Sequence, residues 1–235
     1  MITLLGRLLL APLARLIYRP RIHGRENVPR RGAVLLASNH LSFVDSVVIT
    51  LVAPRRVAFL AKDAYFTGRG FKGWLSRSFF TAIGAVGVVR GAGSAAQDAL
   101  DKGLQILKAG EAFAIYPEGT RSLDGRLYKG RTGVAWLALT AGCPVVPVAL
   151  EGTQRLQPVG SRIPRLHRIS VTFGEPLDLS RFGSADSGRA RRHATDEVMR
   201  RIQLLSGQEM APGYNEPPVA PMERVRRMFR RGHDR

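Results

Sequence analysis

Two side chains that could together remove a proton lie close to each other in the stretch SNHLSFVDS, residues 38–46. Four residues separate His40 from Asp45, and an apolar run that predicts a strand ends just before them. Imidazole accepts protons near neutral pH, and a carboxylate can hold one ring nitrogen so that the other stays available. Asp45 could also cap the backbone N–H groups of a helix that begins here. The two roles do not exclude each other.

A second polar cluster, YPEGTRS at residues 116–122, also follows an apolar run. Gly119 allows close approach of the backbone, the Arg121 guanidinium suits a phosphate, and Glu118 can accept hydrogen bonds from hydroxyl groups. A plain turn with a surface ion pair would contain the same residue types. Because ligands of open α/β sheets bind outside the carboxyl ends of the strands, the two clusters together favour one site at a sheet edge.

Six apolar runs predict the strands that position these clusters, and helical patterns fill most of the gaps. Short apolar strands separated by helices are typical of a largely parallel sheet covered by helices, so we expect an α/β fold. The predicted strands are residues 33–38, 56–62, 85–90, 112–117, 144–150 and 168–173.

Capping residues mark the ends of three predicted helices. Ser42 is the expected N-cap of the first helix, Asp45 lies in its first turn, and Gly142 ends the third. The predicted helices span residues 43–53, 94–110, 132–142 and about 188–205, and basic surface loops are expected at 126–133 and 152–168.

The charge of the chain narrows the choice of partner. Its 235 residues carry a formal net charge of +18, which indicates a polyanionic partner, either an anionic membrane surface or nucleic acid. The basic segment 189–201 also contains acidic residues, and the sequence shows no recognised RNA-binding motif, so a membrane is favoured. The single cysteine, Cys143, excludes an internal disulfide, and no Cys/His spacing resembles a metal site.

Both ends of the chain combine apolar and basic residues. Residues 1–25 predict an amphipathic helix in a membrane interface, although the same pattern would suit a helix docked on the protein's own core. The apolar stretch is too short to span a bilayer. Residues 26–206 are the expected main domain, and 207–235 are expected to form a proline-rich linker and a basic tail suited to anionic lipid.

Four ordered blocks resemble those of the glycerolipid acyltransferase family, of the type that acylates lysophosphatidic acid. The blocks are NHLSFVD (39–45), GAVGVVRG (84–91), YPEGTRS (116–122) and VVPVAL (145–150). Members of this family transfer a fatty acyl group from a thioester donor to glycerol phosphate or to its monoacyl ester. The resemblance therefore implies that residues 26–206 form an acyltransferase domain.

The resemblance also implies roles for single residues. His40 matches the catalytic histidine and Asp45 its partner. The positions associated with the phosphorylated acceptor are Lys62, Arg90, Glu118, Gly119, Thr120 and Arg121. The second block departs from the family pattern, because Val88 and Val89 stand where many members have a bulky apolar residue and an aspartate. That departure weakens the match at Arg90.

The implied reaction takes an acyl group from acyl-CoA, or from acyl-carrier protein, to 1-acyl-sn-glycerol 3-phosphate and forms phosphatidic acid. Glycerol 3-phosphate or another lysophospholipid is the alternative acceptor. Beyond the thioester cosubstrate, no cofactor and no metal are expected. The implied location is the cytoplasmic face of the cell membrane, peripheral or monotopic, with anionic phospholipid as partner; a basic nucleic-acid-binding protein is the rival hypothesis. Residues 79–89 could line an acyl groove or form core.

Overall fold

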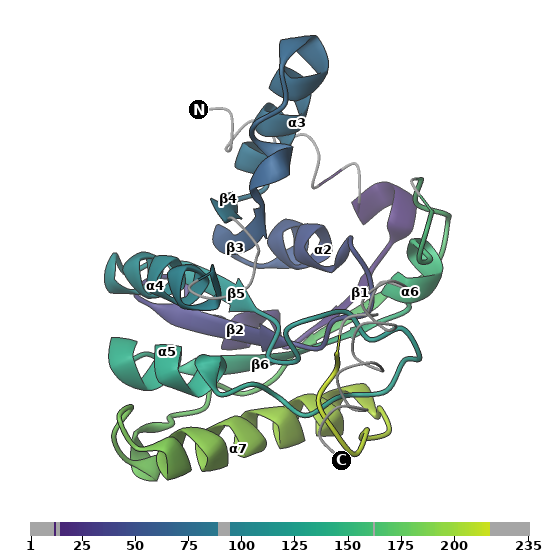
Figure 1. Ribbon diagram of the computed structural model, residues 1–235. Helices are drawn as coiled ribbons and strands as arrows, with labels where there is room; N and C mark the ends of the chain where they lie inside the picture. Colours follow the sequence, from purple (N-terminus) through teal and green to yellow (C-terminus); the bar gives the residue numbers. More distant parts are fainter. Residues whose placement is uncertain (1–11, 13–14, 89–94, 162, 217–235) are drawn as a thin grey trace, which may run out of the picture.

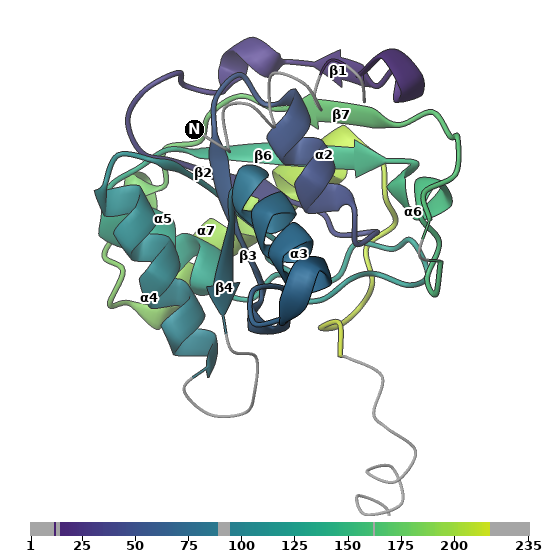
Figure 2. The same cartoon turned by 90° about the horizontal axis from the view of Figure 1, so that it is seen from above.

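The computed structural model describes residue 12 and residues 15–88, 95–161 and 163–216. Strands in these ranges form one sheet in the order β1-β7-β6-β2-β5-β3-β4, and Figure 2 shows β1 and β4 at its opposite edges. The strands are β1 (Arg21–His23), β2 (Val34–Ser38), β3 (Val57–Lys62), β4 (Ala85–Val88), β5 (Ala112–Ile115), β6 (Val145–Glu151) and β7 (Ser170–Phe173).

Helices cover both faces of the sheet (Figure 1). They are α2 (Asp45–Val52), α3 (Gly70–Ala82), α4 (Ala95–Lys108), α5 (Gly133–Ala141), α6 (Thr153–Leu156) and α7 (Gly188–Ser206), with 3-10 turns η1 (Arg25–Asn27), η2 (Asp63–Tyr65) and η3 (Ser180–Phe182). None of the described helices combines the length and hydrophobicity that a membrane crossing requires.

The sheet is largely parallel, as the apolar runs predict. Strands β6, β2, β5, β3 and β4 run in one direction, whereas β7 pairs with β6 in the antiparallel sense and β1 is parallel to β7. The first residues of β1 and β7 therefore lie at the same edge as the last residues of the other strands. At this end of the sheet, which we call the carboxyl edge, the ends of elements that are far apart in the sequence lie close together.

Two apolar cores lie on the two sides of the sheet. Val34 and Leu36 of β2 face the core beneath α2, while Leu35 and Ala37 face the core beneath α4, α5 and α7. Successive side chains of a strand point to opposite faces, so a strand buried on both faces must be apolar at every position. This requirement explains why the strands appear in the sequence as continuous apolar runs.

The six predicted strands are confirmed, with ends that differ by at most two residues where they are described. Residues 89 and 90 of the third predicted strand, Ser94, most of the predicted N-terminal helix and the basic tail lie outside the described residues. The strand β1, the helices α3 and α6 and the three 3-10 turns were not predicted, and α6 lies in the stretch 152–168 that was expected to be a surface loop. The expectation that Ser42 caps the first helix is wrong, because α2 begins at Asp45 and its N-cap residue is Val44.

Candidate active site

Asn39 fixes the exit of the chain from β2. Its buried side-chain amide donates to the carbonyl oxygen of Leu150 at 2.9 Å and accepts from the N–H of Leu150 at 2.8 Å. The amide thus extends the hydrogen bonding between β2 and β6 by one residue. A further bond to the Gln208 Oε1 atom, at 2.7 Å, ties it to the chain beyond α7. The next residue, His40, therefore starts from a fixed position at the carboxyl edge.

His40 and Asp45 are in direct contact. The Asp45 Oδ2 atom accepts three hydrogen bonds, from His40 Nδ1 at 2.8 Å, from the Leu41 N–H at 2.6 Å and from the Ser42 N–H at 2.8 Å. Asp45 thus orients the imidazole and also satisfies backbone donors, although these donors precede the helix. Because a carboxylate only accepts, Nδ1 is the donor in this contact, and in a neutral imidazole Nε2 then keeps its lone pair. Asp45 is fully buried, whereas the His40 side chain is 17% exposed.

Tyr116, which the sequence analysis did not single out, supports the imidazole from one side. The His40 and Tyr116 rings are stacked, with centroids 3.8 Å apart and planes inclined by 12°. The Tyr116 hydroxyl is hydrogen-bonded to Ser46 Oγ at 2.7 Å, so both ends of the phenol are held. Burial raises the pKa of Tyr116 well above its ordinary value, and the nearby Asp45 adds to the effect. The sequence feature that could have pointed to Tyr116 is an aromatic residue at the end of a predicted strand.

Glu118 binds the backbone of the HLSFVD segment. Its fully buried carboxylate accepts from the His40 N–H at 3.1 Å and from the Tyr128 N–H at 2.9 Å. On the other side of the same residue, the Ser122 N–H donates to the His40 carbonyl oxygen at 2.7 Å. Burial raises the pKa of Glu118 to about 7, although both backbone hydrogen bonds oppose the increase. Glu118 was expected to contact the acceptor, but its contacts in this structure are with the protein backbone.

The rest of the 116–122 segment presents its polar groups beside this contact. Gly119 has a φ of +80°, a left-handed conformation that favours glycine, and an added Cβ would lie 2.9 Å from Arg131 Nε. The carbonyl oxygens of Thr120 and Arg121 accept from Asn215 Nδ2, at 3.4 and 3.0 Å. The described part of the predicted linker therefore packs against this turn. Arg121 is half-buried, and within the described chain no carboxylate pairs with its guanidinium group.

Of the other predicted cations, Lys62 lies further along the same edge. Lys62 is exposed at the end of β3, which is the sheet neighbour of β5 and thus of the strand that leads into residues 116–122. Arg90 lies outside the described residues. A basic residue of the predicted loop 126–133 contacts the 116–122 segment, because the Arg131 N–H donates to the Pro117 carbonyl oxygen at 2.7 Å. Lys129 and Arg131 also lie over the Tyr214 ring, at 5.4 and 5.6 Å from its centroid.

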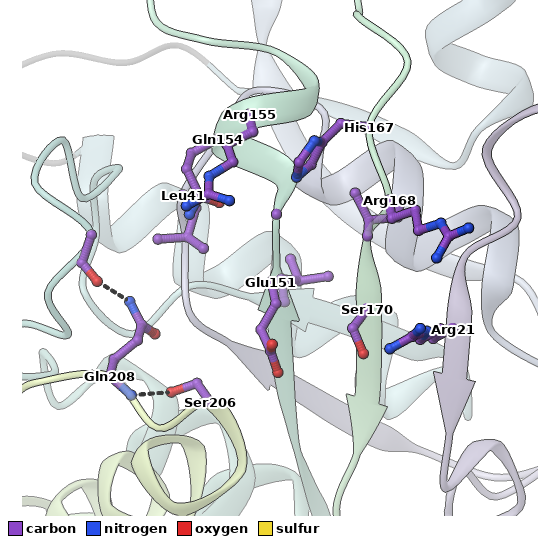
Figure 3. A pocket seen from close by; sticks show the side chains of 14 residues that line it. Arg21, Leu41, Glu151, Gln154, Arg155, His167, Arg168, Ser170, Ser206 and Gln208 are labelled. Atoms are coloured by element: carbon purple, nitrogen blue, oxygen red, sulfur yellow. Dashed lines mark hydrogen bonds between the residues drawn. The ribbon is translucent and has the colours of Figure 1, made fainter.

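An open cavity of about 420 Å³ adjoins the HLSFVD segment at Leu41. It lies where the ends of β6, β7 and β1 meet, on the side of β2 away from β5 (Figure 3). Leu41, the residue after His40, contributes to its wall, and Arg21, Arg155 and Arg168 give it a cationic rim. Glu151 is the acidic member of the lining. Figure 3 shows Gln208 held by two hydrogen bonds at one side of this cavity. Cationic side chains therefore lie on both sides of β2, the strand that ends two residues before His40.

The site has the components of a general base. An imidazole oriented by a buried carboxylate keeps its second nitrogen available, and a guanidinium follows on the neighbouring turn. Within the ranges that the structure describes, no three metal-binding side chains gather into a cluster. In chemical terms, an oriented imidazole at the carboxyl edge of an α/β sheet can accept a proton from a hydroxyl group.

Comparison with known proteins identifies the family. Residues 19–151 match the family model described as Acyltransferase, and the chain belongs to this acyltransferase family. The fold is similar to the crystal structure of the 1-acyl-sn-glycerophosphate (LPA) acyltransferase PlsC from Thermotoga maritima, with a TM-score of 0.62 and 25% identity. That similarity covers 85% of this chain and 81% of the other.

Curated relatives with similar sequences include plant and bacterial proteins. The chloroplastic 1-acyl-sn-glycerol-3-phosphate acyltransferase BAT2 of Brassica napus is 33% identical over 61% of this chain and 40% of its own length. The 1-acyl-sn-glycerol-3-phosphate acyltransferase of Bacillus subtilis is 25% identical over 79% of this chain and 87% of its own length. The chain thus spans about two fifths of the plant relative and most of the bacterial one.

Proposed function

We propose that the protein transfers a fatty acyl group from a thioester donor to 1-acyl-sn-glycerol 3-phosphate and so forms phosphatidic acid. The observation that carries this proposal is the 2.8 Å contact between His40 Nδ1 and Asp45 Oδ2 at the carboxyl edge of the sheet. The names of the relatives from Brassica napus and Bacillus subtilis support the choice of acceptor.

In the proposed reaction, His40 Nε2 takes the proton of the acceptor hydroxyl group. The acceptor oxygen then attacks the thioester carbonyl carbon, and the bond between this carbon and sulfur breaks. The thiolate that leaves takes the proton from the imidazolium, so that a thiol and an ester are the products. Asp45 remains ionised throughout and stabilises the positive charge that His40 acquires. No nucleophile from the protein is required, because the acceptor oxygen attacks directly.

Positioning supplies the remainder of the rate enhancement. General-base catalysis contributes about 10²–10⁴-fold, so the acceptor must also be held with its hydroxyl group near Nε2. Arg121 is proposed to bind the acceptor phosphate, together with Lys62 and Arg90, while Gly119 and Thr120 shape the turn that presents Arg121. Glu118 is proposed to hold the backbone on which His40 lies. The contacts of Glu118 and Ser122 with the His40 backbone support the role of Glu118, and the resemblance of the sequence blocks supports the roles of the cations.

The proposed donor is acyl-CoA or acyl-carrier protein, and the reaction needs no further cofactor because the thioester is already activated. We also propose that the protein binds peripherally to anionic phospholipid at the cytoplasmic face of the cell membrane. Two features support a membrane partner over nucleic acid: the acceptor is itself a lipid, and the net charge of +18 accompanies exposed apolar side chains.

The test presents the purified protein with labelled palmitoyl-CoA and a panel of acceptors that includes lysophosphatidic acid and glycerol 3-phosphate. Mass spectrometry should detect phosphatidic acid with the lysophospholipid, and His40→Ala should lower kcat by about 10²–10⁴-fold. Circular dichroism checks that the variant is folded. Equal activity of His40→Ala and the parent would disprove the assignment of the base, and transfer only to glycerol 3-phosphate would replace the proposed acceptor.

A further inference from the structure

The outward side of α3 exposes four large apolar side chains, which we name the α3 face. The exposed fractions are 75% for Phe71, 53% for Trp74, 54% for Leu75 and 40% for Phe79. Successive residues of a helix are about 100° apart around its axis, so these four positions lie on one side of α3. Contiguous apolar surface of this kind on a folded domain marks a place where something binds.

Contacts on the opposite side hold α3 in this orientation. Gly73 lies against Gly68 so closely that an added Cβ would be 2.0 Å from the Gly68 carbonyl oxygen. The Ser76 hydroxyl donates to the Tyr65 carbonyl oxygen at 2.9 Å, and the Phe80 ring stacks on the Tyr65 ring with centroids 4.4 Å apart. Because this side is packed against the domain, α3 cannot rotate to bury the α3 face without losing these contacts.

The charged side chains on α3 and at its N-cap are all basic. Arg69, Lys72 and Arg77 are exposed on or beside the helix, and the sequence contains no acidic residue between Asp63 and Asp98. In the part of the chain that the structure describes, no ion pair neutralises Arg69 or Lys72. Aromatic side chains flanked by Lys and Arg suit the interface of an anionic bilayer, where the rings enter the acyl boundary and the cations meet lipid phosphates.

The same charges disfavour a second copy of the protein as the occupant. Two α3 faces packed together would bring Arg69, Lys72 and Arg77 of each copy close to those of the other, and like charges repel when water is excluded. A bilayer that contains phosphatidylglycerol offers the opposite charge together with an apolar interior.

A series of aromatic contacts connects α3 with the active site. Phe79 contacts Phe80 with ring centroids 5.4 Å apart, and Phe80 stacks on Tyr65. Tyr65 in turn contacts Phe43 at 5.9 Å, and Phe43 lies in the sequence between His40 and Asp45. A bilayer docked on α3 would therefore lie beside the HLSFVD segment.

Other exposed apolar residues lie on the side of the sheet that carries α2. Figure 1 shows α3 and the loop after α6 rising on this side, and Figure 2 shows α2 and α3 together in front of the sheet. Leu16 belongs to a helical turn that is bonded to α2 through Arg15, and Ile163 and Leu166 belong to the loop after α6. All three side chains are exposed.

We propose that the α3 face docks the protein on an anionic lipid bilayer and holds the active site at the membrane surface. The inference rests on the proposed function in one respect: the benefit of docking is that the active site gains access to a lipid acceptor. The chain ends were the surfaces that the sequence predicted for membrane contact; α3 adds a contact that is anchored to the folded domain.

The test uses the two tryptophans, Trp74 and Trp136. In the full-length Trp136→Phe variant, Trp74 is the only tryptophan, so its fluorescence reports the environment of the α3 face. Vesicles of phosphatidylcholine and phosphatidylglycerol that carry brominated acyl chains should quench this fluorescence. Vesicles of phosphatidylcholine alone should quench it at least about tenfold less at equal lipid concentration.

The second measurement is cosedimentation with the same anionic vesicles. A variant with Phe71→Ser, Trp74→Ser and Leu75→Ser should need at least about tenfold more lipid for half-maximal binding. Leu204→Ser on α7 is the matched control, because Leu204 is 66% exposed but lies on the helix that covers the other face of the sheet. It should bind as the parent does. Circular dichroism confirms that each variant is folded.

Three results would overturn the docking proposal: Trp74 stays unquenched while the protein cosediments, the triple variant binds like the parent, or Trp74 becomes buried through dimerisation, seen as a doubled mass by light scattering. A failure of the proposed function would look different. The parent would then transfer no acyl group to any acceptor, while Trp74 would still be quenched by anionic vesicles.

Discussion

The imidazole of His40 lies flat on the ring of Tyr116, with centroids 3.8 Å apart. This stack links the two polar segments of the site through side chains, while Glu118 and Ser122 link them through the His40 backbone. The geometry around His40 therefore depends on a segment that begins 76 residues further along the chain, at Tyr116.

We expect Tyr116 to position His40. Tyr116→Leu should lower kcat by about 2- to 10-fold, because an aromatic stack contributes about 0.5–1.5 kcal/mol. Tyr116→Phe keeps the stack and loses only the hydrogen bond to Ser46, so its kcat should stay closer to that of the parent. Steady-state kinetics at saturating acceptor measure both. Equal losses in the two variants would assign the effect to the hydroxyl group instead.

We expect Glu118 to make stability depend on pH. Its pKa in the folded protein, about 7, lies above the ordinary value of 4.5, so folding favours the protonated form. The stabilisation from this group is complete below about pH 4.5 and is lost as the pH rises through about 7, by up to about 3 kcal/mol. Urea unfolding of the parent and of Glu118→Gln should therefore give a difference in unfolding free energy that falls across this window. A difference that is constant with pH would contradict the assignment.

We expect Arg121 to bind the acceptor phosphate. Arg121→Ala should raise the acceptor KM by about 10- to 100-fold, because a hydrogen bond to a charged group contributes about 1.5–3 kcal/mol. Arg121→Lys should recover part of the loss, since an ammonium keeps the charge without the forked geometry. Arg189→Ala, at an exposed position of α7, serves as the control for the loss of one positive charge. An unchanged KM for Arg121→Ala would exclude this role.

We expect Asn39 to contribute to stability as well as to the site. Asn39→Ala leaves the buried N–H and carbonyl groups of Leu150 without the partners that they have now, which costs about 1–3 kcal/mol for each group. Asn27→Ala removes a single hydrogen bond, to the Phe173 carbonyl oxygen, and should cost less. Urea unfolding at neutral pH compares the two variants. A smaller effect at Asn39 than at Asn27 would show that the amide is not an essential link between β2 and β6.

The predictions that succeeded rest on short-range patterns. A strand buried on both faces has to be apolar throughout, so β2, β5 and β6 could be located from their residues alone. Gly142, which ends α5 with a φ of +61°, marks its helix in the same local way. By contrast, α3 is apolar on its packed and on its exposed side, so it lacks the amphipathic pattern by which a surface helix is recognised.

The sequence by itself determined the class of the fold, the pairing of His40 with Asp45 and the second polar segment at residues 116–122. Only the tertiary structure decided that Glu118 holds the His40 backbone, that Tyr116 supports its ring and that α3 presents apolar side chains outward. The physical reason is the separation in the sequence between the residues that interact. Strand periodicity and helix capping depend on neighbouring residues, whereas these contacts arise when packing of the sheet brings the ends of β2 and β5 together.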